Sequence, residues 1–109
     1  MTLIRYKKSN SKHTIEIDGH AEFAKRGQDI VCSAISAITY SLINALEKQQ
    51  SADMIYDLLV DYGVAHINIS FLCPDDDFAD ALLCSSLCGY RLIFKNYPAN
   101  VQLVEGFSI

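Results

Sequence analysis

Apolar and polar residues alternate along the first part of the chain, which is the pattern of β-strands with one buried face. The alternation covers residues 2–8 and resumes at residues 14–18, where isoleucine alternates with polar side chains. The small polar residues at positions 9–11 favour a turn because their side chains bond to the local backbone. These two segments therefore predict a β-hairpin.

The clearest helical pattern begins at Asp29. Apolar side chains then recur every three or four residues up to Leu46, so we expect a helix that ends near Gln49. The preceding segment, bounded by Gly19 and Gly27, fits neither the helical nor the strand period. We expect it to be a mobile loop.

The second half of the chain predicts another hairpin and another helix. Residues 54–60 and 64–72 would form the strands, turning at 61–63, although the first run is short enough to be helical instead. Pro74 and three aspartates at 75–77 suit a helix start and lack the spaced ligands of a calcium loop. Gly89 could end this helix and leave residues 90–94 as a strand. A last strand is expected at 101–104.

The predicted order is strand, strand, helix, strand, strand, helix, strand, which is an α+β fold with a mostly antiparallel sheet. The 109 residues, half of them apolar, suit a single domain over 1–109. A net charge of −4 argues against direct nucleic-acid binding. Polar residues interrupt every apolar stretch, and the N-terminus lacks a signal-peptide core, so we expect no membrane segment and a cytoplasmic protein. The four cysteines should then stay reduced.

Cys32 is the strongest candidate for chemistry. It falls in the first turn of the helix that begins near Asp29, where free amide groups and the helix dipole stabilise a thiolate. His20, in the preceding loop, could take the thiol proton and pass it to a leaving amine. The same residues also fit a buried cysteine and an ordinary loop histidine.

Asp29 and Ser36 each have a functional and a structural interpretation. Asp29 could orient His20 or hold a substrate amide, but its carboxylate also suits a helix cap, and a negative charge near Cys32 opposes a thiolate. Ser36 lies one helical turn beyond Cys32, where it could touch substrate or simply pack on the helix.

The remaining cysteines allow a metal site. Cys73, Cys84 and Cys88, with His66, could ligate zinc, but they form no Cys-x-x-Cys pair and are set in apolar sequence. Core packing of the three thiols is the simpler expectation. We expect His13 to be solvated in a charged turn and His66 to be structural.

Two segments resemble the ribosomal-processing cysteine protease family Prp. They are GHA at residues 19–21 and GQDIVCSAIS at residues 27–36. The family pattern is Gly-His-Ala, a short spacer, then Gly-x-Asp-Ile-Val-Cys-Ala-Ala-x-Ser, from which Ser33 departs. Residues 44–46 and the late Tyr97-Pro98 followed by Val101 are also similar to the family pattern.

The resemblance implies a small α+β homodimer that removes the N-terminal extension of large-subunit ribosomal protein number twenty-seven. Cys32 would be the nucleophile, His20 the general base and acid, and Asp29 an assisting residue. Gly19 and Gly27 would flank a loop that rearranges around substrate. The second helix would run through Asn96, and no metal or cofactor is implied.

The implied reaction is attack by the Cys32 thiolate on a peptide carbonyl, with amides at the helix start stabilising the oxyanion. Two other classes stay open. One is a non-catalytic module that binds a ribosomal partner with the same fold. The other is a redox sensor based on Cys32, which needs a resolving thiol nearby.

Overall fold

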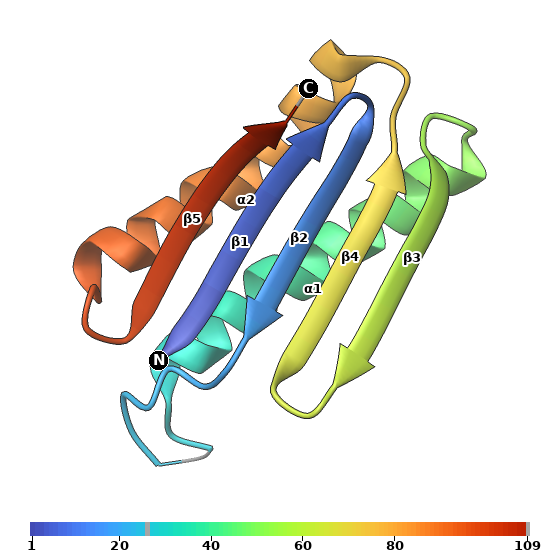
Figure 1. Ribbon diagram of the computed structural model, residues 1–109. Coiled ribbons are helices and arrows are strands. Elements are labelled where there is room, and N and C mark those ends of the chain that lie inside the picture. Colours follow the sequence, from blue (N-terminus) through green and yellow to red (C-terminus); the bar gives the residue numbers. More distant parts are fainter. Residues whose placement is uncertain (26, 109) are drawn as a thin grey trace.

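A computed structural model describes residues 1–25 and 27–108 and confirms the predicted order of elements. The strands are β1 (Thr2–Ser9), β2 (Lys12–Asp18), β3 (Tyr56–Gly63), β4 (His66–Leu72) and β5 (Val101–Ser108). The helices are α1 (Ile30–Ser51) and α2 (Asp76–Asn96). The strands form one sheet in the order β3-β4-β2-β1-β5, and both helices lie against the same face of it (Figure 1).

The sheet is mixed, with three antiparallel pairings and one parallel pairing. β5 runs parallel to β1 at the edge of the sheet, while β1, β2, β4 and β3 pair antiparallel in turn. The expected mostly antiparallel sheet is therefore confirmed. Because side chains alternate along a strand, one face carries the core residues Ile4, Ile15 and Ile69 and packs against the helices.

The first hairpin has the predicted turn, but the second turns later than predicted. Ser9 pairs with Lys12, so the first turn is Asn10-Ser11, with Asn10 in the left-handed region that asparagine tolerates. β3 continues through the predicted turn at 61–63, and the chain turns at Val64-Ala65 instead. A helix over residues 54–60 is wrong, because these residues lead into a strand that pairs with β4.

His13 is not solvated, contrary to the sequence-based expectation. Its ring is fully buried and stacks on the Phe71 ring, with centroids 5.1 Å apart. A 2.7 Å hydrogen bond joins its Nδ1 to the Tyr6 hydroxyl. The reason is register: β2 begins at Lys12, so His13 shares the inward face with Ile15 and Ile17. The adjacent charged residue, Lys12, lies on the opposite face.

Gly89 does not end the second helix, which runs through Asn96 as the family resemblance implied, so a strand over 90–94 is wrong. The glycine instead permits close packing of the two helices. A Cβ at this position would lie 2.8 Å from Cδ1 of Ile38 on α1. A side chain at this position would therefore have to displace the end of the Ile38 side chain.

By length and composition, α1 could cross a membrane, which the polar interruptions in the sequence did not suggest. In the structure, its apolar face is part of the core. Val31, Ile35, Leu42, Ile43 and Leu46 are buried in the same cluster as the inward side chains of the sheet. The packing of this helix in the fold accounts for its apolarity.

Candidate active site

The loop between β2 and α1 meets the start of α1 at Asp29. Asp29 is the predicted helix cap: its Oδ1 accepts hydrogen bonds from the amides of Val31 at 3.0 Å and Cys32 at 2.9 Å. Such bonds satisfy amides that a helix start leaves without partners. The cap places Cys32 in the first turn of α1, as predicted.

The same carboxylate also holds the loop, which the sequence did not reveal. Its Oδ2 accepts from the amides of Phe23 at 3.0 Å and Ala24 at 3.4 Å. The pKa of Asp29 lies below its ordinary value, chiefly because the Cys32 amide donates to it, with smaller contributions from the loop amides. Glu22 adopts a left-handed φ of 55°, rare for a residue with a side chain, just before the two bonded amides. Asp29 thus fastens the loop to the helix that carries Cys32.

The Cys32 sulfur receives a main-chain hydrogen bond from this loop. The amide of Ala21 donates to Sγ at 3.3 Å. Cys32 is half-buried, whereas the Ala21 methyl group is fully buried. The thiol is therefore held at the edge of the core, with one side open to solvent.

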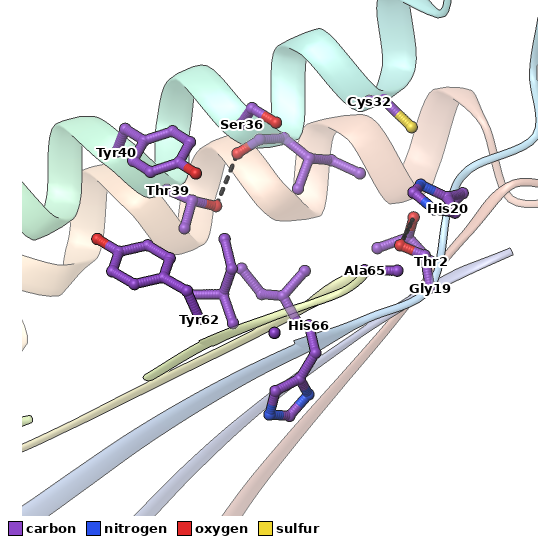
Figure 2. Close-up of a pocket in the computed structure, with 14 residues that line it drawn as sticks. Thr2, Gly19, His20, Cys32, Ser36, Thr39, Tyr40, Tyr62, Ala65 and His66 are labelled. Carbon is purple, nitrogen blue, oxygen red and sulfur yellow. Dashed lines mark hydrogen bonds between the residues drawn. The ribbon is translucent and has the colours of Figure 1, made fainter. Parts of the chain in front are cut away.

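His20, Cys32 and Ser36 together line two adjoining cavities. The first, of about 290 Å³, runs between α1 and the end of the β3–β4 hairpin (Figure 2). The second, of about 450 Å³, extends over the loop to Gly27 and Asp29. Figure 2 shows Cys32 projecting from α1 and His20 on the loop that leaves β2. The structure thus brings the predicted thiol, imidazole and serine to the walls of one groove.

An aromatic pair closes the far end of the first cavity. Tyr40 of α1 and Tyr62 of β3 are both half exposed, and their rings stack with centroids 6.3 Å apart. Stacked, exposed rings of this kind offer an apolar surface to a bound side chain. They give the groove an apolar end away from the Cys32 thiol.

Three amides at the helix start donate to Asp29. Those of Val31 and Cys32 already donate to the Asp29 carboxylate, and the Ser33 amide donates to the Asp29 carbonyl at 3.1 Å. The capping interaction that positions Cys32 therefore uses the same donors that the sequence-based mechanism assigned to an oxyanion.

A turn late in the chain supports the loop from outside. Nδ2 of Asn100 donates to the Ala21 carbonyl at 2.9 Å. The Phe23 ring packs edge-on against Tyr97, with centroids 5.4 Å apart. In the sequence, Tyr97 stands out only as part of a family pattern, and nothing points to Asn100. Residues so far apart in the sequence leave no local pattern that predicts their contact.

The other cysteines and His66 do not assemble with Cys32. Cys73 is buried beside the main-chain oxygen atoms of Met54 and Asp75, so its expected core packing is confirmed. Cys84 and Cys88 are exposed on α2 with their sulfurs 4.0 Å apart, so core packing is wrong for these two. His66 also lines the first cavity, but its ring is directed away from α1 and pairs with Asp18, as expected for a structural residue (Figure 2). In the described ranges 1–25 and 27–108, no group of three or more His, Cys, Asp or Glu residues could hold a metal ion.

Known proteins are similar to this chain over most of its length. The family model for Cysteine protease Prp matches residues 1–102. The ribosomal processing cysteine protease Prp of Staphylococcus aureus is 32% identical over 89 residues, 80% of each chain. The corresponding protein of Bacillus subtilis is 34% identical over 92 residues, 83% of this chain and 82% of that protein.

A solved structure shows the same architecture. The essential ribosomal processing protease Prp from S. aureus, crystallised with a covalently linked product peptide, superposes with a TM-score of 0.81 and 25% identity. The superposition covers 96% of this chain and 99% of that one. This chain therefore belongs to the Prp family of ribosomal processing cysteine proteases.

Proposed function

We propose that this protein is an endopeptidase in which Cys32 is the nucleophile and His20 is the general base and acid. The observation that carries the proposal is the shared groove: both side chains line the same two cavities, and a main-chain amide donates to the Cys32 sulfur. A half-buried thiol with an exposed imidazole beside the same groove is an arrangement suited to acyl transfer.

In this mechanism, His20 takes the proton of Cys32, and the sulfur attacks the scissile carbonyl. His20 then protonates the leaving amine, and water hydrolyses the thioester. When substrate binds, the loop between Gly19 and Gly27 rearranges at the exposed His20 and brings the imidazole to the sulfur, while Ala21 keeps its place. Ser36, one turn along α1 in both cavities, contacts the bound peptide.

The substrate we propose is the precursor of large-subunit ribosomal protein number twenty-seven, whose N-terminal extension is removed. Support comes from the family, whose members are ribosomal processing proteases. The stacked Tyr40 and Tyr62 rings offer an apolar wall for such a peptide. We further propose that the protein acts as a homodimer in the cytoplasm, without binding nucleic acid directly.

The test is cleavage of the host's own precursor by the wild type, Cys32→Ala and His20→Ala. We expect the wild type to trim the precursor at one site. Each variant should lose at least about a hundredfold in kcat while remaining folded, because each removes a participant in bond cleavage. Cys84→Ala is the matched control, since Cys84 is an exposed thiol on α2 far along the chain.

Other outcomes would decide between the remaining classes. Full activity of Cys32→Ala would show that another group is the nucleophile. A wild type that binds the precursor without cutting it would be a binding module. Sedimentation of the purified protein tests the homodimer, which a single monomeric species at micromolar concentration would contradict.

A further inference from the structure

The amide of Ala21 is the main-chain donor that the described structure directs at the Cys32 sulfur. The distance between its nitrogen and Sγ is 3.3 Å. Ala21 immediately follows His20, so one loop segment supplies both the imidazole and this donor. An amide so placed stabilises negative charge on sulfur, because hydrogen bonds to an ionised acceptor are about twice as strong as neutral ones.

The neighbouring amides are engaged elsewhere. Those of Val31 and Cys32 donate to Oδ1 of Asp29, and those of Phe23 and Ala24 donate to Oδ2. Removing any of them from Asp29 would leave a buried carboxylate short of partners, which is costly. The Asp29 carboxylate thus engages two amides of the helix start and two of the loop.

Asn100 holds Ala21 through the carbonyl of the next peptide unit, on the other side of the Ala21 Cα from the N–H. Nδ2 of Asn100 donates to the Ala21 carbonyl at 2.9 Å, and the Asn100 carbonyl accepts from the Thr2 amide at 2.9 Å. The Ala21 side chain is 1% exposed. This residue is therefore held by a buried methyl group and a hydrogen-bonded carbonyl, with its N–H facing the sulfur.

We propose that the main-chain amide of Ala21 is a catalytic donor that stabilises negative charge at Cys32, first on the sulfur and then on the oxyanion, and that Asn100 positions it. The inference rests on the proposed endopeptidase function.

During attack, a bond forms between Sγ and the carbonyl carbon, and the π electron pair moves onto the carbonyl oxygen. That oxygen is bonded to the carbon which Sγ has attacked, so a donor already contacting Sγ is within reach of it. When the intermediate collapses, the C=O bond re-forms, the C–N bond breaks, and the amine leaves with the proton from His20. A donor that is already aligned needs no rearrangement during this sequence.

The direct test replaces Ala21 with lactic acid in the full-length protein. This turns the N–H into an ester oxygen and keeps both the buried methyl group and the carbonyl that Asn100 binds. We expect kcat to fall by about 10²–10³ with little change in KM, the loss typical of one oxyanion donor. Lactic acid at Ala52 is the matched control: it removes a main-chain amide that donates to the Lys48 carbonyl at 3.2 Å, at the opposite end of α1 from Cys32, and should leave kcat within about twofold of the wild type.

The positioning role is tested with Asn100→Asp, which keeps the shape of the side chain and removes its donor. We expect kcat to fall by about tenfold, less than for the ester, because the amide is misaligned but not lost. Asn96→Asp is the control, since Asn96 donates only to the Leu92 carbonyl of its own helix at 2.9 Å. The control should retain wild-type kcat.

A second readout does not require cleavage. The rate of Cys32 alkylation by iodoacetamide near neutral pH, with Cys84 as an internal reference, reports stabilisation of the thiolate. It should fall for the ester at position 21 and for Asn100→Asp, and not for the two controls. A wild type that cuts no precursor would refute the endopeptidase, while the alkylation rates would still test the amide.

Unchanged alkylation in the ester variant, or a kcat within about twofold of wild type in a protease that is active, would overturn the proposal.

Discussion

Gly19 and Gly27 flank the active-site loop with the same backbone conformation but in different surroundings. Both have φ of +88°, in the left-handed region that glycine adopts without penalty. A Cβ on Gly19 would lie 2.5 Å from the Met1 carbonyl oxygen, a main-chain atom, whereas a Cβ on Gly27 would meet nothing within 4 Å. A side chain at Gly27 would therefore cause backbone strain alone, whereas a side chain at Gly19 would cause the same strain and a steric clash.

We expect Gly27→Ala to lower the free energy of unfolding by about 1–2 kcal/mol, the cost of a left-handed residue with a side chain. Gly19→Ala should cost more, about 3 kcal/mol or above, because the strand start at Met1 and Thr2 must also shift. Urea unfolding of both variants gives the comparison. Equal losses would show that the contact with Met1 relaxes without penalty.

Individual side chains of the site were predictable from the sequence, but their main-chain partners were not. Cys32 at a helix start, His20 in a glycine-flanked loop and Asp29 as a cap follow from local rules of spacing and capping. The Ala21 amide has no sequence signal, because every residue but proline carries one. Asn100 contributes from a distant turn, so only the folded chain reveals its contact.

At the level of elements, α1 and α2 are joined by a buried hydrogen bond between two hydroxyl groups. Thr39 donates to the Ile35 carbonyl at 2.7 Å, and its oxygen lies 2.7 Å from the Tyr90 hydroxyl. Because the single Thr39 proton is already used, Tyr90 is the donor in this pair. Burial raises the pKa of Tyr90 to about 12, so the phenol keeps its proton.

Thr39→Val should therefore destabilise the protein by about 1–3 kcal/mol, since it leaves the Tyr90 hydroxyl buried without this acceptor. Tyr90→Phe should cost only about 1 kcal/mol, because Thr39 keeps its bond to Ile35. The double variant should be more stable than Thr39→Val alone. Urea unfolding of the wild type, the two single variants and the double variant forms a double-mutant cycle. If the two losses in unfolding free energy simply add in the double variant, the hydrogen bond between Thr39 and Tyr90 is contradicted.

The elements themselves were predicted better than their ends. Periodicity predicted β1, β2, β4 and α1 plainly, whereas the segment of β3, which has no buried residue, also fitted a helix, and the full length of α2 came from the family resemblance. The turn between β3 and β4 was predicted too early in the chain. Gly63 indicated a turn in the sequence, but in the structure it pairs with His66 in the sheet. Gly89 similarly indicated a helix break, whereas the helix-to-helix contact with Ile38 explains it.

Across the whole molecule, the helices cover one face of the sheet, and the opposite face carries paired charges. Arg5 lies 3.5 Å from Glu16 on neighbouring strands, and His66 on β4 bonds Asp18 on β2. The hydrogen bond with Asp18 holds the pKa of His66 above its ordinary value of 6.5. Asp29, by contrast, has a pKa below its ordinary value of 3.8.

These two shifts have opposite consequences for stability. A lowered carboxyl pKa stabilises the fold above pH 3.8, and this contribution is lost as the pH falls through the lower folded value. A raised histidine pKa stabilises it below pH 6.5, and this contribution is lost as the pH rises through the higher folded value. From these two groups, we expect the free energy of unfolding to be greatest between pH 3.8 and pH 6.5.

Urea midpoints measured across this pH range test the assignment. Asp29→Asn should flatten the decline on the acid side only, and Asp18→Asn should flatten the decline on the alkaline side only. A variant that keeps the wild-type slope on its own side would show that its carboxylate does not control that part of the profile.

The support that Tyr97 and Asn100 give to the loop has a consequence for synthesis of the protein. Translation delivers His20 and Cys32 early, but the turn that braces Phe23 and Ala21 emerges some seventy residues later in the printed sequence. A nascent chain that stops before Tyr97 also lacks β5, the parallel partner of β1. The contacts that surround the Cys32 thiol are therefore complete only after nearly all of these residues have been made.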